Sequence, residues 1–483
     1  MFETQLLIGG KDVAASGGKT FERRNPLSGD VASRAAAASV ADANAAADAA
    51  AAAYPAWSAL GPNARRALLL KAADSLAARA PDFIARMQAE IGATAAWAGF
   101  NVHLASSMLR EAAAMTTQIG GEVIPSDKPG CLSMATRESV GVVLGIAPWN
   151  APVILGTRAV AMPLACGNTV VLKASETCPA THRLIAEAIQ QAGLPDGVIN
   201  VVSNAPADAA EVVAALIAHK AVRRINFTGS TKIGRVVAEL AARQLKPVLL
   251  ELGGKAPLVV LDDADLDEAV KAAAFGAFMN QGQICMSTER IVVDNAVGDA
   301  FVAKFAAKAK SLTSGDPRQG NVALGALVNV EAVDRVLALV DEAVSQGAKL
   351  VAGGSRDGAV MSATVLDHVT PDMRIYHEES FGPVACVVRA DGEAAAVHAA
   401  NDTEYGLSAA VFSRNIPRAL TVAKRIDSGI CHINGPTVHD EAQMPFGGVK
   451  ASGYGRFGGK AGVEQFTELR WITLETQPGH FPI

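Results

Sequence analysis

Charged side chains are scarce in this sequence, and the two signs nearly cancel. Only 19% of its 483 residues are Asp, Glu, Lys or Arg, and 43 basic against 48 acidic residues give a formal net charge of -5. Proteins that bind the phosphate backbone of nucleic acids carry a strong basic excess. The composition therefore argues against a nucleic-acid partner and favours a small molecule.

Paired cysteines and long apolar runs are also lacking. None of the six cysteines forms a C-x-x-C pair or adjoins clustered histidines, which argues against a disulfide framework and predicts no metal site. The most apolar stretch, residues 140–147, is far shorter than the ~20 residues that span a bilayer, and the N-terminus lacks the basic region of a signal peptide. We expect a cytoplasmic protein without a membrane partner.

The pattern of apolar residues predicts an α/β fold. Residues 41–97 are rich in alanine and predict helices that break at Pro55, at Gly61-Pro62 and at Ala80-Pro81. From residue 140 onward, β-branched runs alternate with helical stretches, which is typical of a buried parallel sheet. The strands predicted for this sheet are 142–146, 169–173, 198–202, 224–227 and 248–251.

A second series of strands begins after Gly253-Gly254, which predicts a second α/β unit. A chain of 483 residues is long enough for two, because single cores stop growing at roughly 250–300 residues. Residues 121–139 predict a protruding hairpin, and 466–475 alternate like a strand with no obvious partner. We expect both to complete a subunit contact in a homo-oligomer, either a dimer or a tetramer. The strands predicted for the second unit are 257–261, 289–293, 363–368, 385–389, 408–412 and 429–433.

Three residues near predicted strand ends carry groups suited to catalysis. Cys285 lies among small and amide-bearing residues whose free N–H groups would stabilise a thiolate or oxyanion, although a lone Cys is also a common core residue. Glu251 ends an apolar run and would serve as a general base, or would simply pair with Lys255. Asn150, between two prolines, is either an oxyanion donor or a turn residue.

Two further strand ends are suited to binding phosphate and ribose. Gly229, Ser230 and Gly234 open a helix whose free N–H groups would face an anion, although a strand-to-helix turn also needs glycine. Lys173 and Glu176 follow another strand. A carboxylate there would accept from a ribose 2′-hydroxyl and repel a 2′-phosphate, or it would form a surface ion pair.

Together these segments resemble the NAD(P)-dependent aldehyde dehydrogenases. The resemblance covers essentially the whole chain, because seven motifs occur in the family's order. It implies a Rossmann-like cofactor domain (1–120 and 140–252), a catalytic α/β domain (253–453) and small bridging elements (121–139 and 464–483). The motifs are Pro148-Trp-Asn150, Lys173-Ala-Ser-Glu176, Phe227-Thr-Gly-Ser-Thr231, Leu250-Glu-Leu-Gly-Gly-Lys255, Gln281-Gly-Gln-Ile-Cys285, Glu378-Glu-Ser-Phe-Gly-Pro383 and Pro445-Phe-Gly-Gly-Val-Lys450.

The resemblance also assigns roles to residues. It implies that Cys285 is the nucleophile, that Glu251 is the general base, and that Asn150 with the N–H of Cys285 forms the oxyanion hole. NAD is the expected cofactor because Glu176 would repel a 2′-phosphate. Its implied contacts are Lys173 and Glu176 at the adenosine ribose, Ser230 between Gly229 and Gly234 at the pyrophosphate, Trp149 beside the cofactor, and Glu379 and Phe381 at the nicotinamide ribose.

The expected substrate is an aromatic aldehyde. Aromatic residues make up only 5% of the chain, so Trp97 is notable, and with Met279 and Ile284 it would form an apolar wall for a flat ring. Arg158 either faces the tunnel mouth and attracts an oxygen-bearing substrate, or is a structural Arg that snorkels to a helix end. Ala159 replaces a lysine that many relatives carry, so a proton relay through that lysine is not expected.

Within the family, the sequence looks most like the bacterial salicylaldehyde dehydrogenases, with vanillin and benzaldehyde dehydrogenases close behind. A semialdehyde dehydrogenase, in which Arg158 would bind a distal carboxylate, is the alternative enzyme. A catalytically silent relative used as a structural protein is the alternative of another class. Retention of Cys285, Glu251 and Asn150 argues against it.

Overall fold

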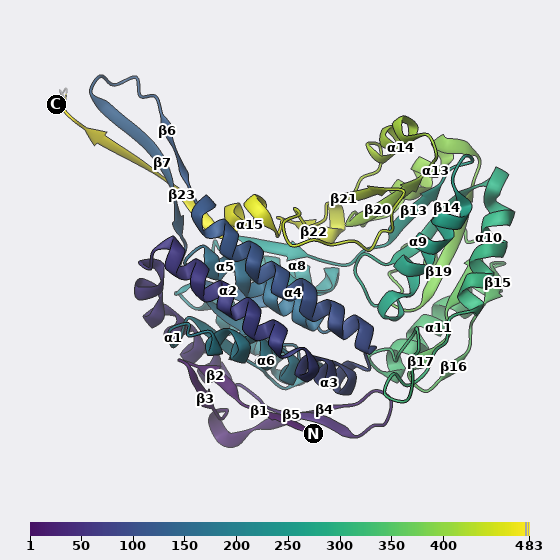
Figure 1. The fold of residues 1–483 in the computed structure, drawn as a ribbon, viewed down its shortest axis with the longest axis horizontal. Coiled ribbons are helices and arrows are strands. Elements are labelled where there is room, and N and C mark those ends of the chain that lie inside the picture. The colour runs from purple at the N-terminus through teal and green to yellow at the C-terminus, as the bar shows by residue number, and fades with distance from the viewer. Residues whose placement is uncertain (479–480, 482) are drawn as a thin grey trace.

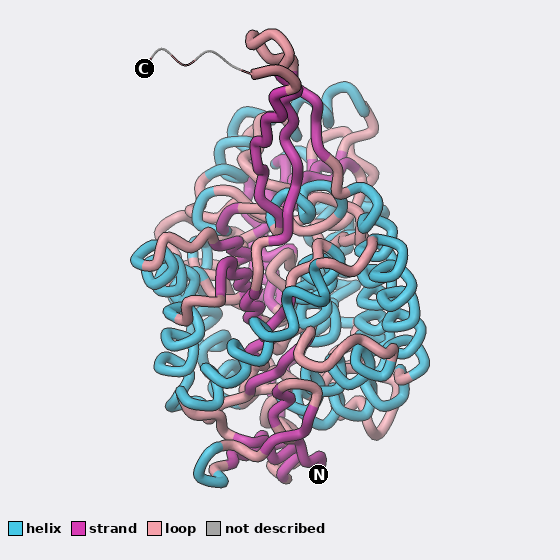
Figure 2. The backbone as a smooth tube through the Cα atoms, turned by 90° about the vertical axis from the view of Figure 1, so that its left-hand side faces the viewer, coloured by secondary structure: helices cyan, strands magenta, loops and turns pink. Residues whose placement is uncertain are grey.

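Five parallel strands form the centre of the first large sheet. The computed structural model describes residues 1–478, 481 and 483. In it the order β22-β12-β11-β8-β9-β10-β2-β3 places antiparallel strands at both edges, and helices cover both faces (Figure 2). The bounds are β2 Leu6–Ile8, β3 Lys11–Val13, β8 Val142–Ile146, β9 Thr169–Lys173, β10 Ile199–Val202, β11 Val222–Thr228, β12 Val248–Glu251 and β22 Gly453–Tyr454.

The second large sheet has the order β15-β18-β19-β14-β13-β20-β21 and is parallel except at β15. Strands β13, β14, β18 and β20 are fully buried, and β19 is buried except at Arg389, as expected for a sheet covered on both faces. All six predicted strands are confirmed. The bounds are β13 Ala256–Val260, β14 Thr288–Asp294, β15 Lys349–Ala352, β18 Thr364–Asp367, β19 Val384–Ala390, β20 Ser408–Phe412 and β21 Ile430–Ile433.

The predicted hairpin and terminal strand form one protruding sheet with the order β23-β7-β6 (Figure 1). β6 (Gly121–Ile124) pairs with β7 (Cys131–Ser139), and β7 pairs along its whole length with β23 (Thr467–Glu475). The missing partner of the terminal strand is therefore β7, more than 300 residues away in sequence. Of the predicted bridging segment 464–483, residues 479, 480 and 482 lie outside the described residues.

The helices confirm the prolines as start signals in two of three cases. Helices begin at Pro62 and next to Pro81, but the predicted break at Pro55 is wrong. Pro55 lies in the last turn of α1, where it removes one hydrogen bond of the helix, but only three helical residues follow it. The helices of the first half are α1 Val40–Ser58, α2 Pro62–Ala78, α3 Ala80–Ile91, α4 Ala95–Met115, α5 Pro152–Ala165, α6 Pro179–Gln191, α7 Ala209–Ala218 and α8 Thr231–Arg243.

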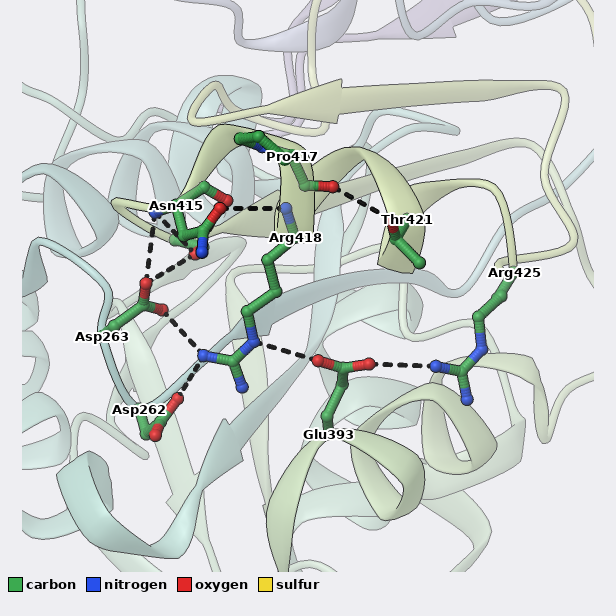
Figure 3. A network of polar contacts seen from close by, with 9 residues as sticks. Asp262, Asp263, Glu393, Asn415, Pro417, Arg418, Thr421 and Arg425 are labelled. Atoms are coloured by element: carbon green, nitrogen blue, oxygen red, sulfur yellow. Dashed lines mark hydrogen bonds and ion pairs between the residues drawn. The ribbon is translucent and has the colours of Figure 1, made fainter.

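Most helices of the second half surround the second sheet, whereas α15 packs against α4 and α5 of the first half. A network of ion pairs fastens α14 to this layer: Arg418 contacts Asp262 and Asp263 after β13, and Glu393 of α13 joins Arg418 to Arg425 (Figure 3). These helices are α9 Leu266–Phe278, α10 Asn295–Lys310, α11 Val330–Ser345, α12 Arg374–His377, α13 Gly392–Asn401, α14 Ile416–Ala423 and α15 Gly459–Gln465.

Short strands that the sequence patterns do not predict complete the fold. The first 36 residues form β1 to β5, of which β2 and β3 extend the first sheet and the rest form a sheet of order β1-β5-β4. Strands of three to six residues are too short for a clear alternation. The remaining bounds are β1 Phe2–Thr4, β4 Thr20–Arg24, β5 Val31–Ala36, β16 Arg356–Asp357 and β17 Val360–Met361.

Candidate active site

The carboxyl edge of the first sheet gathers most of the predicted site residues. Glu251 ends β12, and Gly229 follows its neighbour β11. Asn150 follows β8, and Lys173 ends β9, so four adjacent parallel strands end on one line of candidate residues. Open α/β sheets bind their ligands at this edge.

Cys285 lies on a loop with an unusual backbone. Asn280, Gln281 and Gly282 all adopt positive φ, at 49°, 56° and 69°. Two side-chain hydrogen bonds hold the non-glycine residues there: Gln281 Nε2 donates to Ala326 O at 2.8 Å, and Asn280 Nδ2 donates to Asn150 O at 2.9 Å. Such conformations persist only where buried contacts enforce them, so the half-buried thiol is held in one position.

Asn150 is connected to the same loop. Its side-chain Nδ2 donates to Gln283 O at 2.9 Å, and its own carbonyl accepts from Trp97 Nε1 at 3.0 Å. A carboxamide nitrogen carries two hydrogens, so this contact leaves one free for a substrate oxygen. Turn formation alone does not need these long-range contacts.

Glu251 is only 1% exposed, and neither of its carboxylate oxygens has a hydrogen-bond partner. Burial is the main cause that raises its pKa to about 7. The alternative pairing with Lys255 is wrong, because Lys255 Nζ lies 2.6 Å from Glu289 Oε2. An unpaired buried carboxyl that titrates near neutrality fits a general base.

The environment of Cys285 keeps its thiol protonated. Burial, and after it the negative charge of Glu251, hold the pKa of Cys285 well above its ordinary value. A neutral thiol is a weak nucleophile, so it must lose its proton as it attacks. The arrangement therefore needs a proton acceptor nearby, and Glu251 is close enough to shift the pKa of the thiol.

A cavity of about 340 Å³ opens beside Cys285 and Asn150. It brings together all four predicted substrate residues, namely Trp97, Arg158, Met279 and Ile284. Trp97 stacks on Phe100 with ring centroids 5.7 Å apart, which makes one wall flat and aromatic. Further lining residues carry no signal in the sequence: Phe100, Leu104, Leu155, Phe275, Val438, His439, Asp440 and Phe446.

Arg158 lies in the wall of this cavity with its charge already paired. Its side chain is 6% exposed and forms an ion pair with Asp440, and its guanidinium lies 4.2 Å above the centroid of Phe446. Arg158 is in the middle of α5, so the alternative of snorkelling to a helix end is wrong. Asp440 is 282 residues away in sequence, and no local motif announces it.

The predicted cofactor residues of the first sheet lie at or just beyond the ends of β9 and β11. Lys173 and Glu176 form an ion pair, and Asn204 Nδ2 also donates to Glu176 Oε1 at 2.9 Å, while Asn204 Oδ1 is buried without a partner. Ser230 caps α8, accepting from the N–H of Ile233 at 3.4 Å. The helix starts at Thr231, and Gly234 lets it pack directly on Leu252.

Glu379 and Phe381 reach the site from the second half of the chain. Glu379 Oε1 accepts from the N–H of Gly254 at 3.0 Å, and Phe381 packs edge-on against Trp149 with centroids 5.8 Å apart. A side chain at Gly253 would collide with Glu379, and one at Gly254 with the Cys285 carbonyl. These glycines therefore make room for groups of the protein itself.

The side chains at this edge of the first sheet offer groups suited to a dinucleotide. Within residues 1–478, 481 and 483, no three His, Cys, Asp or Glu side chains gather as metal ligands. By contrast, the start of α8, the Lys173–Glu176 pair and the orphan oxygen of Asn204 offer donors and acceptors for phosphate and ribose.

The described helices include none that is long and apolar enough to cross a membrane.

Comparison with known proteins identifies the family of this chain. Residues 13–472 match the aldehyde dehydrogenase family, and the chain belongs to that family. It is therefore an oxidoreductase that acts on aldehydes with a nicotinamide cofactor, and it has the family's α/β fold.

Relatives of high identity cover the whole length. Vanillin dehydrogenase of Pseudomonas fluorescens is 64% identical over 100% of both chains, and salicylaldehyde dehydrogenase of Pseudomonas putida is 53% identical over 99% of this chain and 100% of its own. The crystal structure of a salicylaldehyde dehydrogenase from Pseudomonas putida G7 complexed with salicylaldehyde superimposes with a TM-score of 0.98. It is 52% identical and covers 100% of each chain.

Proposed function

We propose that this protein oxidises an aromatic aldehyde to the carboxylic acid with NAD. The observation that carries the proposal is the largely apolar cavity that joins Cys285 and Asn150 to the stacked rings of Trp97 and Phe100. The names of the relatives, vanillin and salicylaldehyde dehydrogenase, support an aromatic substrate.

Cys285 begins the reaction in this proposal. Glu251 takes the thiol proton as the sulfur adds to the aldehyde carbon, which gives a tetrahedral thiohemiacetal. The free hydrogen of the Asn150 amide and the N–H of Cys285 stabilise its alkoxide, as two neutral donors in a dry site can. The bound cofactor supplies the hydride acceptor that makes oxidation to the thioester possible.

Glu251 completes the reaction. After it has released the thiol proton to solvent, it removes a proton from the water that attacks the thioester carbon. The C–S bond then breaks to release the acid, and the Cys285 thiolate takes that proton back from Glu251. An acyl transfer to another thiol would not need this base. A free, unpaired carboxylate beside Cys285 therefore supports hydrolysis.

NAD is favoured over NADP by Glu176. Its carboxylate is held by Lys173 and Asn204 beyond the end of β9, where it would accept from a ribose hydroxyl and repel a phosphate. Ser230 with its flanking Gly229 and Gly234 would hold the pyrophosphate at the start of α8. Trp149, Glu379 and Phe381 would border the nicotinamide half.

Salicylaldehyde and vanillin are the first substrates to test, with benzaldehyde as the unsubstituted reference. The pairing of Arg158 with Asp440 leaves little charge for a distal carboxylate, which argues against a semialdehyde. We expect kcat/KM for the aromatic aldehydes to exceed that for succinic semialdehyde. A preference of more than tenfold for the semialdehyde would contradict the proposal, and absence of turnover with every aldehyde would favour a silent relative.

We also infer the division of the chain. Residues 1–120 and 140–252 would form the cofactor domain, since they supply all strands of the first sheet except β22. Residues 253–453 would form the catalytic domain, and 121–139 with 464–483 the bridging element of a homo-oligomer. Exposed Leu469 and Trp471 on β23 support a contact with a second copy.

A further inference from the structure

The ion pair between Arg158 and Asp440 separates two cavities. Both residues line the 340 Å³ cavity beside Cys285, and both also line a smaller cavity of about 30 Å³ behind it. The guanidinium of Arg158 is held between the rings of Phe446 and Phe457, at 4.2 and 5.6 Å from their centroids. The pair is thus a fixed polar spot in a wall that is otherwise mostly apolar.

Asp440 has acceptor capacity that the protein does not use. Its Oδ2 contacts Arg158, whereas its Oδ1 is buried without any hydrogen-bond partner. A buried acceptor left unsatisfied costs about 1–3 kcal/mol, which a ligand that brings a donor would recover. Because Arg158 already balances the charge, the missing partner is a neutral donor rather than a second cation.

We propose that Asp440 is a specificity-determining residue that accepts a hydrogen bond from a hydroxyl group on the ring of the aromatic aldehyde. This inference rests on the proposed function and narrows its substrate class to hydroxylated benzaldehydes. Arg158 is the positioning residue, since it holds one carboxylate oxygen and leaves the other for the substrate. A methyl ether at the same ring position has no proton to donate.

The contact would also favour the chemistry. A hydroxyl conjugated with the aldehyde deactivates the carbonyl if it loses its proton, because the phenolate feeds electron density into the carbonyl carbon. The Asp440 carboxylate accepts a hydrogen bond from the neutral hydroxyl and repels the negatively charged phenolate. It therefore selects the neutral form of the substrate, whose carbonyl is more electrophilic. The same residue would then serve recognition and reactivity.

The test compares hydroxybenzaldehydes with their methyl ethers at the ortho, meta and para positions. At one position at least, wild-type kcat/KM should favour the hydroxyl by about tenfold, the effect of one hydrogen bond to a charged group. Asp440→Asn keeps the side-chain volume, and its oxygen can still accept from Arg158, which turns an amide donor toward the cavity. The hydroxyl-to-ether ratio should then fall about tenfold.

Asp367→Asn is the matched control, because Asp367 also pairs with a partly buried arginine, Arg389, at 2.9 Å, but on the second sheet at β18. It should leave the ratio unchanged. If Asp440→Asn fails to fold, binding of the same compounds to Cys285→Ala gives the ratio without turnover.

The outcomes separate the two proposals. Oxidation of every aromatic aldehyde with a ratio near one overturns the role of Asp440 alone, and so does a ratio that survives Asp440→Asn, as it would if a water in the smaller cavity were the partner of Asp440. Lack of turnover with all aromatic aldehydes overturns the proposed function itself.

Discussion

Lys255 Nζ lies 2.6 Å from Glu289 Oε2, and both side chains are buried, at 0% and 2% exposed. Glu289 uses the same carboxylate to accept from the N–H groups of Ser380 and Phe381, at 2.7 and 3.0 Å. The pair therefore fixes the segment that carries Glu379 and Phe381. It also removes the nearest lysine in sequence from Glu251, which leaves that carboxyl free.

Breaking this pair should destabilise the protein. Lys255→Met leaves Glu289 buried without its counter-charge, and we expect the free energy of unfolding to fall by about 3–5 kcal/mol. The double variant with Glu289→Gln should lose less. Lys271→Met, which breaks an exposed pair with Glu268, is the control and should cost at most about 1 kcal/mol in urea unfolding. Equal losses in the two single variants would contradict the argument.

The base assignment predicts a stalled enzyme. Glu251→Gln should release at most about one NADH per active site, more slowly than wild type because the Cys285 thiol has lost its proton acceptor, and then stop because the thioester is not hydrolysed. Cys285→Ala should show no burst, and Cys131→Ala, a distant thiol on β7, should behave as wild type. Stopped-flow absorbance of NADH measures this. Turnover of Glu251→Gln at the wild-type rate would exclude Glu251 as the base.

Thioester hydrolysis should depend on pH through Glu251. Because its pKa is raised to about 7, the carboxyl is mostly protonated below pH 7 and cannot accept a proton from water. The single-turnover rate of acid release should therefore rise with pH, change by about tenfold per unit below the pKa, and level off above it. Glu251→Gln should abolish this limb of the profile. A rate that falls as the pH rises through 7 would contradict the assignment.

Glu176 should control the choice of cofactor. Glu176→Gln removes the charge that would repel a 2′-phosphate, so the ratio of kcat/KM for NAD to that for NADP should fall by about tenfold. Glu187→Gln, on the neighbouring helix α6, serves as the charge control. An unchanged ratio would show that another group discriminates between the cofactors.

The protruding sheet should carry the subunit contact. Leu469 and Trp471 are two residues apart on β23, lie on one face, and are 60% and 75% exposed. Leu469→Glu with Trp471→Glu should convert the oligomer to monomers in light scattering. Leu245→Glu, at an apolar residue elsewhere that is 92% exposed, should leave the mass unchanged. A protein that is monomeric before substitution would refute the proposed contact.

Local patterns were sufficient for the central strands of both sheets. Fully buried parallel strands are continuous apolar runs that end in glycine or a polar residue, so β8, β9, β11 and β12 can be read from the chain, as can the residues at their carboxyl ends. Those ends lie at one edge in any parallel sheet, which is why Asn150, Glu251 and Lys173 could be grouped before the fold was known.

Contacts between distant segments were decided only by the tertiary structure. Lys255 pairs with Glu289 and not with Glu251, β23 pairs with β7, and Arg158 pairs with Asp440. None of these pairings produces a periodic pattern in the sequence, because each depends on which surfaces pack together. The sequence by itself determined the fold class and the chemical groups at the strand ends. The tertiary packing decided which polar groups are paired and which are left free, as Glu251 and one oxygen of Asp440 are. The reason is that only burial beside particular neighbours changes the charge and the hydrogen bonding of a side chain.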